Sequence, residues 1–129
     1  MKPQLNHIIV AAHDKHTSAD FLAEILGLDV PITWGHFAQV ETGNGVGIDF
    51  VDADEVHSMH LAFLVTEAEF DEIFGRIQAA GIEYWADPMR SRPGEINTND
   101  GGRGVYFPDP SGNFLEILTR PYGSGPKSA

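Results

Sequence analysis

The chain contains an internal repeat, and this feature limits its fold more than any other. The segment NGVGIDFV (44–51) aligns without gaps on SGNFLEIL (111–118). Upstream, LNHIIV (5–10) resembles MHLAFLV (59–65), and each is an apolar stretch with one early histidine. Self-similarity of this kind indicates two copies of one supersecondary unit. A chain of 129 residues has room for two such modules around a shared core.

The repeat places chemically similar residues at matching positions. His7 corresponds to His60, and Asp49 corresponds to Glu116. The histidines are 53 residues apart and the acids are 67 apart, so the second copy holds fourteen extra residues. Most of them fall in the irregular stretch 86–103, and long loops in compact domains are usually functional.

Each copy also carries one helix with readable ends. The first is expected to open at Thr17, to run over 18–26 and to stop at Gly27. The second opens with the capping box that begins at Thr66, and its apolar residues recur at helical spacing until Gly81.

Short strands with turn residues between them are expected after both helices: 29–34, 37–42 and 46–52 in the first copy, and 82–85, 104–107 and 114–119 in the second. The sequence therefore predicts an α+β fold made of two βαβββ modules. We expect one domain over residues 1–123, with module 1 at about 3–54 and module 2 at about 55–120. Residues 124–129 lack periodicity and are expected to form a flexible tail.

The composition limits which classes of molecule the chain is expected to bind. The net charge of −11 argues against nucleic acid and against anionic membrane surfaces, so a small-molecule substrate and metal cations are better candidates. The absence of cysteine excludes disulfides and thiolate ligands, and leaves nitrogen and oxygen to hold any metal. With no signal peptide or membrane span in the sequence, we expect a cytoplasmic protein.

The repeated histidines and acids predict a metal site. On a strand, residues two apart share a face, which places His7, His60 and Glu116 on apolar faces. Burying a carboxylate costs several kcal/mol without a partner, and these strands contain no lysine or arginine. One divalent ion would serve as that partner, with Zn, Ni, Fe and Mn as candidates. Asp49 is either a fourth ligand or a residue that orients a histidine.

Other readings of the same residues compete with this one. A single strand histidine is more often a structural hydrogen-bonding residue than a ligand, and only the repetition favours the metal. The remaining histidines are interpreted as surface or loop residues: His13, His16, His36 and His57. The GNGVG run is rejected as a phosphate loop because a strand follows it where a helix is needed.

Two longer motifs carry a resemblance to a known family. The first is NHIIV followed by D-x-x-x-S-x-x-F (14–21) and the Leu-Gly pair 26–27, and the second is YFPDPSGNFLEIL (106–118). Over nearly its whole length the chain resembles the vicinal oxygen chelate superfamily. This superfamily includes glyoxalases, extradiol dioxygenases, fosfomycin-modifying enzymes and bleomycin-resistance proteins.

The resemblance also implies a sheet shape, an oligomeric state and roles for individual residues. It implies a cupped eight-stranded mixed sheet with the metal on its concave side, and commonly a homodimer whose site forms within one chain or across two. Glu116 is then also the catalytic group that shuttles a proton. Tyr106 is either a substrate-binding residue or a packed strand tyrosine, and Arg103 either binds an anionic substrate group or is a solvated loop residue.

Three functions remain open at the level of sequence. The leading one is a glyoxalase-type lyase or isomerase acting on a small substrate with neighbouring oxygens, supported by Asp49. The second is an iron-dependent extradiol-type dioxygenase with two histidines and one carboxylate as ligands. The third is a binding protein that sequesters a drug or metabolite, as bleomycin-resistance proteins do.

Overall fold

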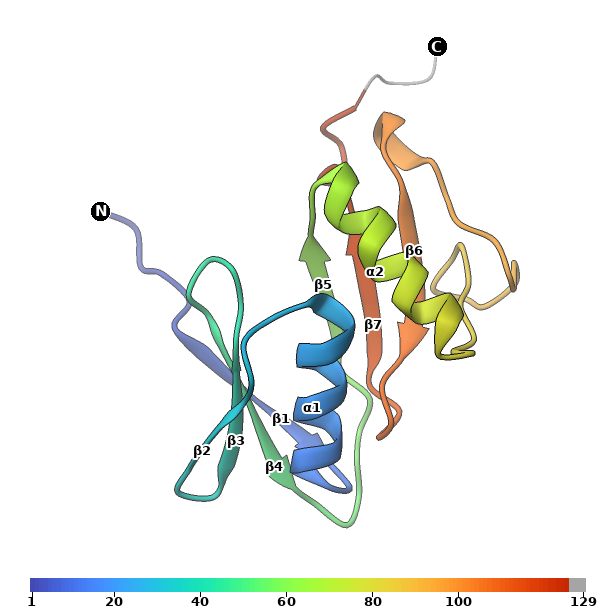
Figure 1. Ribbon diagram of the computed structural model, residues 1–129. Helices are drawn as coiled ribbons and strands as arrows, with labels where there is room; N and C mark the ends of the chain where they lie inside the picture. The colour runs from blue at the N-terminus through green and yellow to red at the C-terminus, as the bar shows by residue number, and fades with distance from the viewer. Residues whose placement is uncertain (126–129) are drawn as a thin grey trace. The chain divides into compact units, whose positions relative to one another are not determined.

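The computed structural model describes residues 1–125, which form two compact units (Figure 1). Residues 1–59 and the turn Asp109–Gly112 make up the first unit, and His60–Pro108 with residues 113–125 makes up the second. The turn belongs to the first unit because the Ser111 hydroxyl accepts a hydrogen bond from the His13 backbone N–H at 3.0 Å. The predicted module boundary at residue 54 thus lies five residues before the boundary between the units.

The first unit is a four-stranded sheet with one helix. It contains β1 (His7–Ala12), α1 (Lys15–Leu26), β2 (Ile32–Trp34), β3 (Phe37–Glu41) and β4 (Gly47–Asp52). The strand order is β1-β4-β3-β2, in which β1 and β4 are parallel and the other pairs are antiparallel. Helix α1 packs on β1, β3 and β4. This is the strand-helix-three-strand pattern that the sequence predicts.

The start of α1 corrects one prediction. The helix begins at Lys15 and not after Thr17, because the Asp14 side chain accepts the backbone N–H of Thr17 at 3.0 Å and acts as the N-cap. This hydrogen bond, together with a weaker one to the His16 backbone, lowers the pKa of Asp14. The predicted end is confirmed, since Gly27 has the left-handed φ of 70° that a C-cap glycine adopts.

The second unit is a three-stranded sheet with one helix. Its elements are β5 (His60–Leu64), α2 (Glu67–Ala79), a short 3-10 turn (Asn99–Gly101), β6 (Gly104–Pro108) and β7 (Phe114–Leu118). The order is β5-β7-β6, with β5 parallel and β6 antiparallel to β7. The predicted capping box at Thr66 is confirmed by both of its reciprocal hydrogen bonds with Glu69.

The fourth strand expected at 82–85 is reduced to a bridge. Trp85 exchanges two backbone hydrogen bonds of 2.9 Å with Tyr106, and no strand extends from it. The chain turns away at once because the Asp87 carboxylate accepts the backbone N–H groups of Ser91 and Arg92. The α+β fold class is confirmed, and residues 1–125 carry seven named strands in two sheets in place of one eight-stranded sheet.

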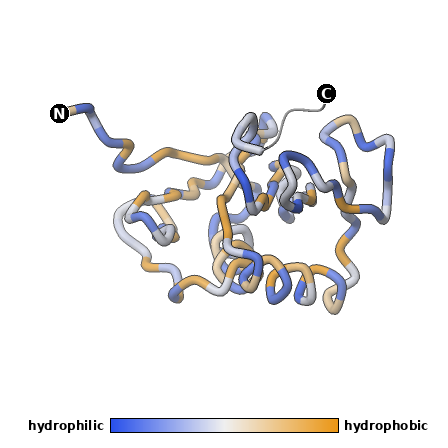
Figure 2. Tube along the Cα trace, turned by 90° about the horizontal axis from the view of Figure 1, so that it is seen from above, coloured by the Kyte–Doolittle hydropathy of each residue, from blue (hydrophilic) through white to orange (hydrophobic). Residues whose placement is uncertain are grey.

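Alternation along β6 and β7 separates a core face from the face that carries Glu116, and residues on both faces are buried. Val105 and Phe107 of β6 and Leu115 and Ile117 of β7 are almost fully buried. Glu116 lies between the last two and therefore points to the other face. Figure 2 shows polar and apolar stretches interspersed along the trace, and no helix within residues 1–125 is long and apolar enough to cross a membrane.

Candidate metal centre

The repeat seen in the sequence is also a repeat in strand register. In each unit the strand that carries the acid is parallel to the strand that carries the histidine. The acid pairs with the residue that follows two positions after the histidine. Asp49 pairs with Ile9 in the first unit, and Glu116 pairs with Ala62 in the second. Because residues two apart share a face, each histidine and its acid lie on the same face of their sheet.

Glu116 is the centre of the site in the second unit. Its side chain is 1% exposed, and each of its carboxylate oxygens has a partner. Oε1 lies 3.0 Å from Nε2 of His60, and Oε2 accepts a hydrogen bond from the Tyr122 hydroxyl. Tyr106, directly opposite Glu116 on β6, places its hydroxyl 2.6 Å from that of Tyr122. No lysine or arginine side chain pairs with Glu116 among the contacts of the described chain.

The protonation of His60 makes this arrangement suitable for a cation. Nδ1 lies 2.9 Å from the carbonyl oxygen of Phe114, which only accepts, so Nδ1 carries a proton. In the neutral ring, Nε2 then presents a lone pair to the carboxylate of Glu116, and two such acceptors repel unless a metal ion lies between them. In the doubly protonated ring, Nε2 donates to that carboxylate. Metal-binding histidines usually donate their other ring N–H to a carbonyl in this way.

The distances also fit two neighbouring ligands of one metal ion. Ligand atoms about 2.1 Å from a metal and roughly at right angles are themselves about 3 Å apart. The separation of 3.0 Å between His60 Nε2 and Glu116 Oε1 agrees with this value. Within residues 1–125, no three histidine, aspartate or glutamate side chains form a group that could hold a metal. The complete predicted set of His7, His60, Glu116 and Asp49 therefore stays a prediction.

The first unit holds its acid differently. Asp49 is 1% exposed and accepts a hydrogen bond from Nε2 of Gln39 at 2.6 Å. Gln39 lies opposite Asp49 on β3, the position that Tyr106 holds relative to Glu116. His7 is exposed and its Nδ1 lies 2.7 Å from the Asn6 side-chain oxygen, which leaves Nε2 without a hydrogen bond to any described residue. Gln39 was not identified from the sequence, because an isolated glutamine in a strand gives no signal.

An aromatic surface adjoins His60 in the second unit. The His60 ring stacks on the Tyr106 ring, with the two ring centres 5.7 Å apart. The Phe114 ring also stacks on the Tyr106 ring, at 5.6 Å. Trp85 contacts Phe114 at 5.9 Å, and the guanidinium of Arg90 lies 4.6 Å from the Phe114 ring. We call these five residues the aromatic face. Alternation with Glu116 could have indicated Phe114, but the loop conformation that brings Arg90 there is not visible in the sequence.

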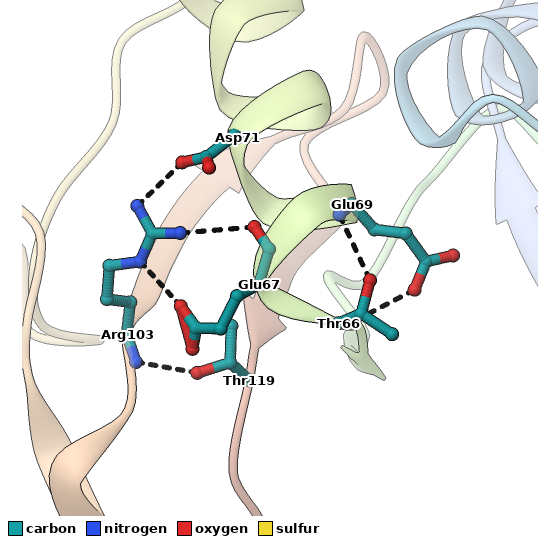
Figure 3. Close-up of polar contacts among 6 residues, drawn as sticks. All are labelled: Thr66, Glu67, Glu69, Asp71, Arg103 and Thr119. Carbon is teal, nitrogen blue, oxygen red and sulfur yellow. Dashed lines mark hydrogen bonds and ion pairs between the residues drawn. The ribbon is translucent and has the colours of Figure 1, made fainter.

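Arg103 directly precedes β6, and its side chain binds residues of α2 (Figure 3). Its Nε and Nη1 donate to the Glu67 and Asp71 carboxylates, each at 2.8 Å, and its Nη2 donates to the Glu67 carbonyl at 3.1 Å. Its guanidinium also stacks 4.4 Å from the Phe70 ring. Hydrogen bonds to these acids raise the pKa of Arg103. Substrate binding by Arg103 stays a prediction, and it would require these pairs to open.

The two tyrosines near Glu116 are held in their neutral form. Burial is the main cause that raises the pKa of Tyr122, and its hydrogen bond to Glu116 acts in the same direction. Burial likewise raises the pKa of Tyr106, partly offset by the hydrogen bond to Tyr122. Because a carboxylate only accepts, the protons point from Tyr106 to Tyr122 and from Tyr122 to Glu116. Tyr106 thus contacts the site, while its predicted role in substrate binding stays a prediction.

These features define a class of protein: an α+β chain of two repeated modules, each with a histidine and an acid on adjacent parallel strands. Residues 4–117 match the profile of the Glyoxalase/Bleomycin resistance protein/Dioxygenase superfamily, and the chain belongs to this family. The resemblance noted in the sequence is thereby confirmed.

Three relatives are enzymes by name. Oxidase ChaP-H2 is 62% identical with a TM-score of 0.95, and the match covers 98% of this chain and 100% of the relative. Oxidase ChaP-H1 is 58% identical with a TM-score of 0.92, covering 95% and 99%. Glutathione transferase FosA of Serratia marcescens is 29% identical over 124 residues, covering 91% of this chain and 81% of the relative.

Proposed function

We propose that this protein is a metal-dependent oxidase that acts on a small oxygenated molecule. The observation that carries the proposal is the 62% identity, over 98% of the chain, to a protein named as an oxidase. The 3.0 Å pairing of His60 Nε2 with the buried Glu116 carboxylate supports it, because both groups can bind the same divalent cation. The similarity to an oxidase therefore favours an oxygen-dependent reaction over the glyoxalase-type reaction, which was the leading prediction from the sequence.

The proposed ligands are His7, His60 and Glu116, which together make the two-histidine, one-carboxylate set typical of iron enzymes that use oxygen. Iron(II) bound there would supply the activation of oxygen. Glu116 would also accept a proton from the substrate at Oε2, the oxygen that the Tyr122 hydroxyl now contacts. We further propose a homodimer, since members of this superfamily commonly form one.

The aromatic face supports a planar substrate. The rings of His60, Tyr106 and Phe114 form a continuous stack beside the carboxylate. Aromatic rings favour offset stacking with other flat π systems. Arg90 adds a positive charge, and among the described residues its guanidinium makes no ion pair. His60, Phe114 and Arg90 are the members of the aromatic face that reach solvent, whereas Trp85 and Tyr106 are buried behind them. At the exposed members we expect a flat molecule with neighbouring oxygens and partial negative charge.

Oxygen uptake tests the proposed reaction. The iron(II)-loaded protein, mixed with catechol and with larger ortho-diphenols in an oxygen electrode, is expected to consume oxygen faster than the same iron without protein. His60→Ala is expected to lower the rate at least about 100-fold, because a ligand is lost. His57→Ala, which removes an exposed histidine three residues away, is the matched control and is expected to react as the wild type.

No uptake above free iron across the panel would count against the oxidase. The glyoxalase-type alternative keeps one specific support, the buried Asp49 at the position equivalent to Glu116. In that case substrate conversion would proceed without oxygen, and Asp49→Asn would abolish it. Recovery of unaltered ligand, with no turnover under either condition, would favour the binding-protein alternative.

A further inference from the structure

The segment that follows β7 makes hydrogen bonds within itself and to Asp100 of the second unit, while the flexible tail expected over 124–129 stays a prediction. The Arg120 guanidinium donates to the Ser124 carbonyl at 3.0 Å, and the Ser124 hydroxyl donates to the Pro121 carbonyl at 2.5 Å. We call residues 119–125 the strap. The predicted tail 124–129 thus begins with two residues that are hydrogen-bonded, and residues 126–129 lie outside the described part of the chain.

Asp100 anchors the end of the strap. Its Oδ1 accepts the backbone N–H groups of Gly123 at 3.2 Å and Gly125 at 3.3 Å. Gly125 approaches Asp100 so closely that a Cβ on it would overlap the Asp100 carbonyl oxygen, so only glycine fits. Asp100 itself has a left-handed backbone with φ of 57°, a conformation that aspartate and asparagine tolerate better than most residues.

One side chain of the strap, that of Tyr122, contacts the proposed metal centre. Tyr122 is 58% exposed as a residue, but its hydroxyl turns inward onto Oε2 of Glu116 and also contacts the Tyr106 hydroxyl. Its ring therefore bridges solvent and a carboxylate that is 1% exposed. With 58% of the residue exposed, burial of the ring does not account for this arrangement, whereas the two hydrogen bonds of the hydroxyl do.

We propose that Tyr122 is a positioning residue for Glu116, a role that rests on the proposed metal site. A free glutamate carboxylate rotates about its last bond over a broad range. The hydrogen bond from Tyr122 fixes Oε2, and this holds Oε1 toward Nε2 of His60, where a metal ion would be shared. The strap, with Asp100 as its anchor, sets the place of the Tyr122 hydroxyl.

Cobalt(II) alone is the probe for this role, because its visible spectrum reports the geometry of its ligands. Removing a hydrogen-bond partner of a metal ligand typically weakens metal binding about 10- to 100-fold. Tyr122→Phe is expected to weaken cobalt(II) binding to the full chain about tenfold and to shift the cobalt absorption. Tyr84→Phe is the matched control, since no hydrogen bond of that hydroxyl occurs in the described chain, and it is expected to bind as the wild type.

A second pair of variants tests the anchor without touching Tyr122. Asp100→Ala removes the acceptor for both glycine N–H groups and is expected to weaken cobalt(II) binding in the same direction as Tyr122→Phe, by a smaller factor. Asp100→Asn keeps an oxygen acceptor and tolerates the left-handed backbone, so it is expected to bind as the wild type.

The outcomes separate this role from the metal site itself. If Tyr122→Phe binds cobalt(II) as Tyr84→Phe does, with an unshifted spectrum, or binds it more tightly, the positioning role is overturned while the site stands. If Glu116→Gln binds cobalt(II) as tightly as the wild type does, or the wild type binds none, the proposed metal site and the role of Tyr122 both fail.

Discussion

Glu116→Gln is expected to abolish metal binding and, at the same time, to stabilise the metal-free protein. An amide is a poor metal ligand compared with a carboxylate, so we expect metal affinity to fall by more than about 100-fold. The amide nitrogen would donate to Nε2 of His60, and the amide oxygen would accept from the Tyr122 hydroxyl. Every polar atom would then have a partner of the correct kind, without a buried charge.

The stabilisation is expected to be about 1 kcal/mol in the free energy of unfolding, measured by urea denaturation of the metal-free protein. Glu95→Gln makes the same chemical change at an exposed loop residue and is expected to change neither stability nor metal affinity. A loss of stability in Glu116→Gln would contradict this account, since it would mean that His60 is charged and forms an ion pair with Glu116 in the absence of metal.

Phe70→Ala is expected to destabilise the second unit strongly. Phe70 lies on α2 and is fully buried, and its ring contacts the Phe74 ring at 5.7 Å and the Arg103 guanidinium at 4.4 Å. Truncating such a side chain leaves a cavity and typically costs about 3–5 kcal/mol. Equilibrium denaturation in urea is the measurement.

Phe74→Ala, on the same helix but only partly buried, serves as the comparison and is expected to cost clearly less. A cost for Phe70→Ala equal to or below that of Phe74→Ala would show that α2 does not pack through Phe70. It would also remove the basis for treating Arg103 as a residue that stacks on this helix.

Local signals in the sequence predicted most of the fold. The capping box at Thr66 and the glycine after α1 are formed by residues within a few positions of one another, so their patterns can be read directly. The repeat predicted two equivalent modules with matching histidines and acids, whereas the parallel pairing of each histidine strand with its acid strand is seen only in the structure. The strand predicted at 82–85 is only a bridge at Trp85, because the Asp87 carboxylate accepts backbone hydrogen bonds from Ser91 and Arg92 and turns the chain.

The candidate site was predicted only in part. His60 and Glu116 meet as expected, since both stand on strands whose alternation fixes their face. Tyr122 could not be found, because its place depends on hydrogen bonds between the strap and Asp100, more than twenty residues away in sequence. A segment rich in glycine, proline and serine looks like an unstructured tail when such partners are unknown.

Metal analysis of the untagged protein as purified, compared with a His7→Ala, His60→Ala double variant, tests the central claim most directly because it requires no substrate. We expect near one equivalent of a divalent transition metal in the wild type and its loss in the double variant. The identity of the metal then bears on the reaction, with iron favouring oxygen chemistry. No metal in either protein, even after reconstitution with iron(II), would contradict the proposed site.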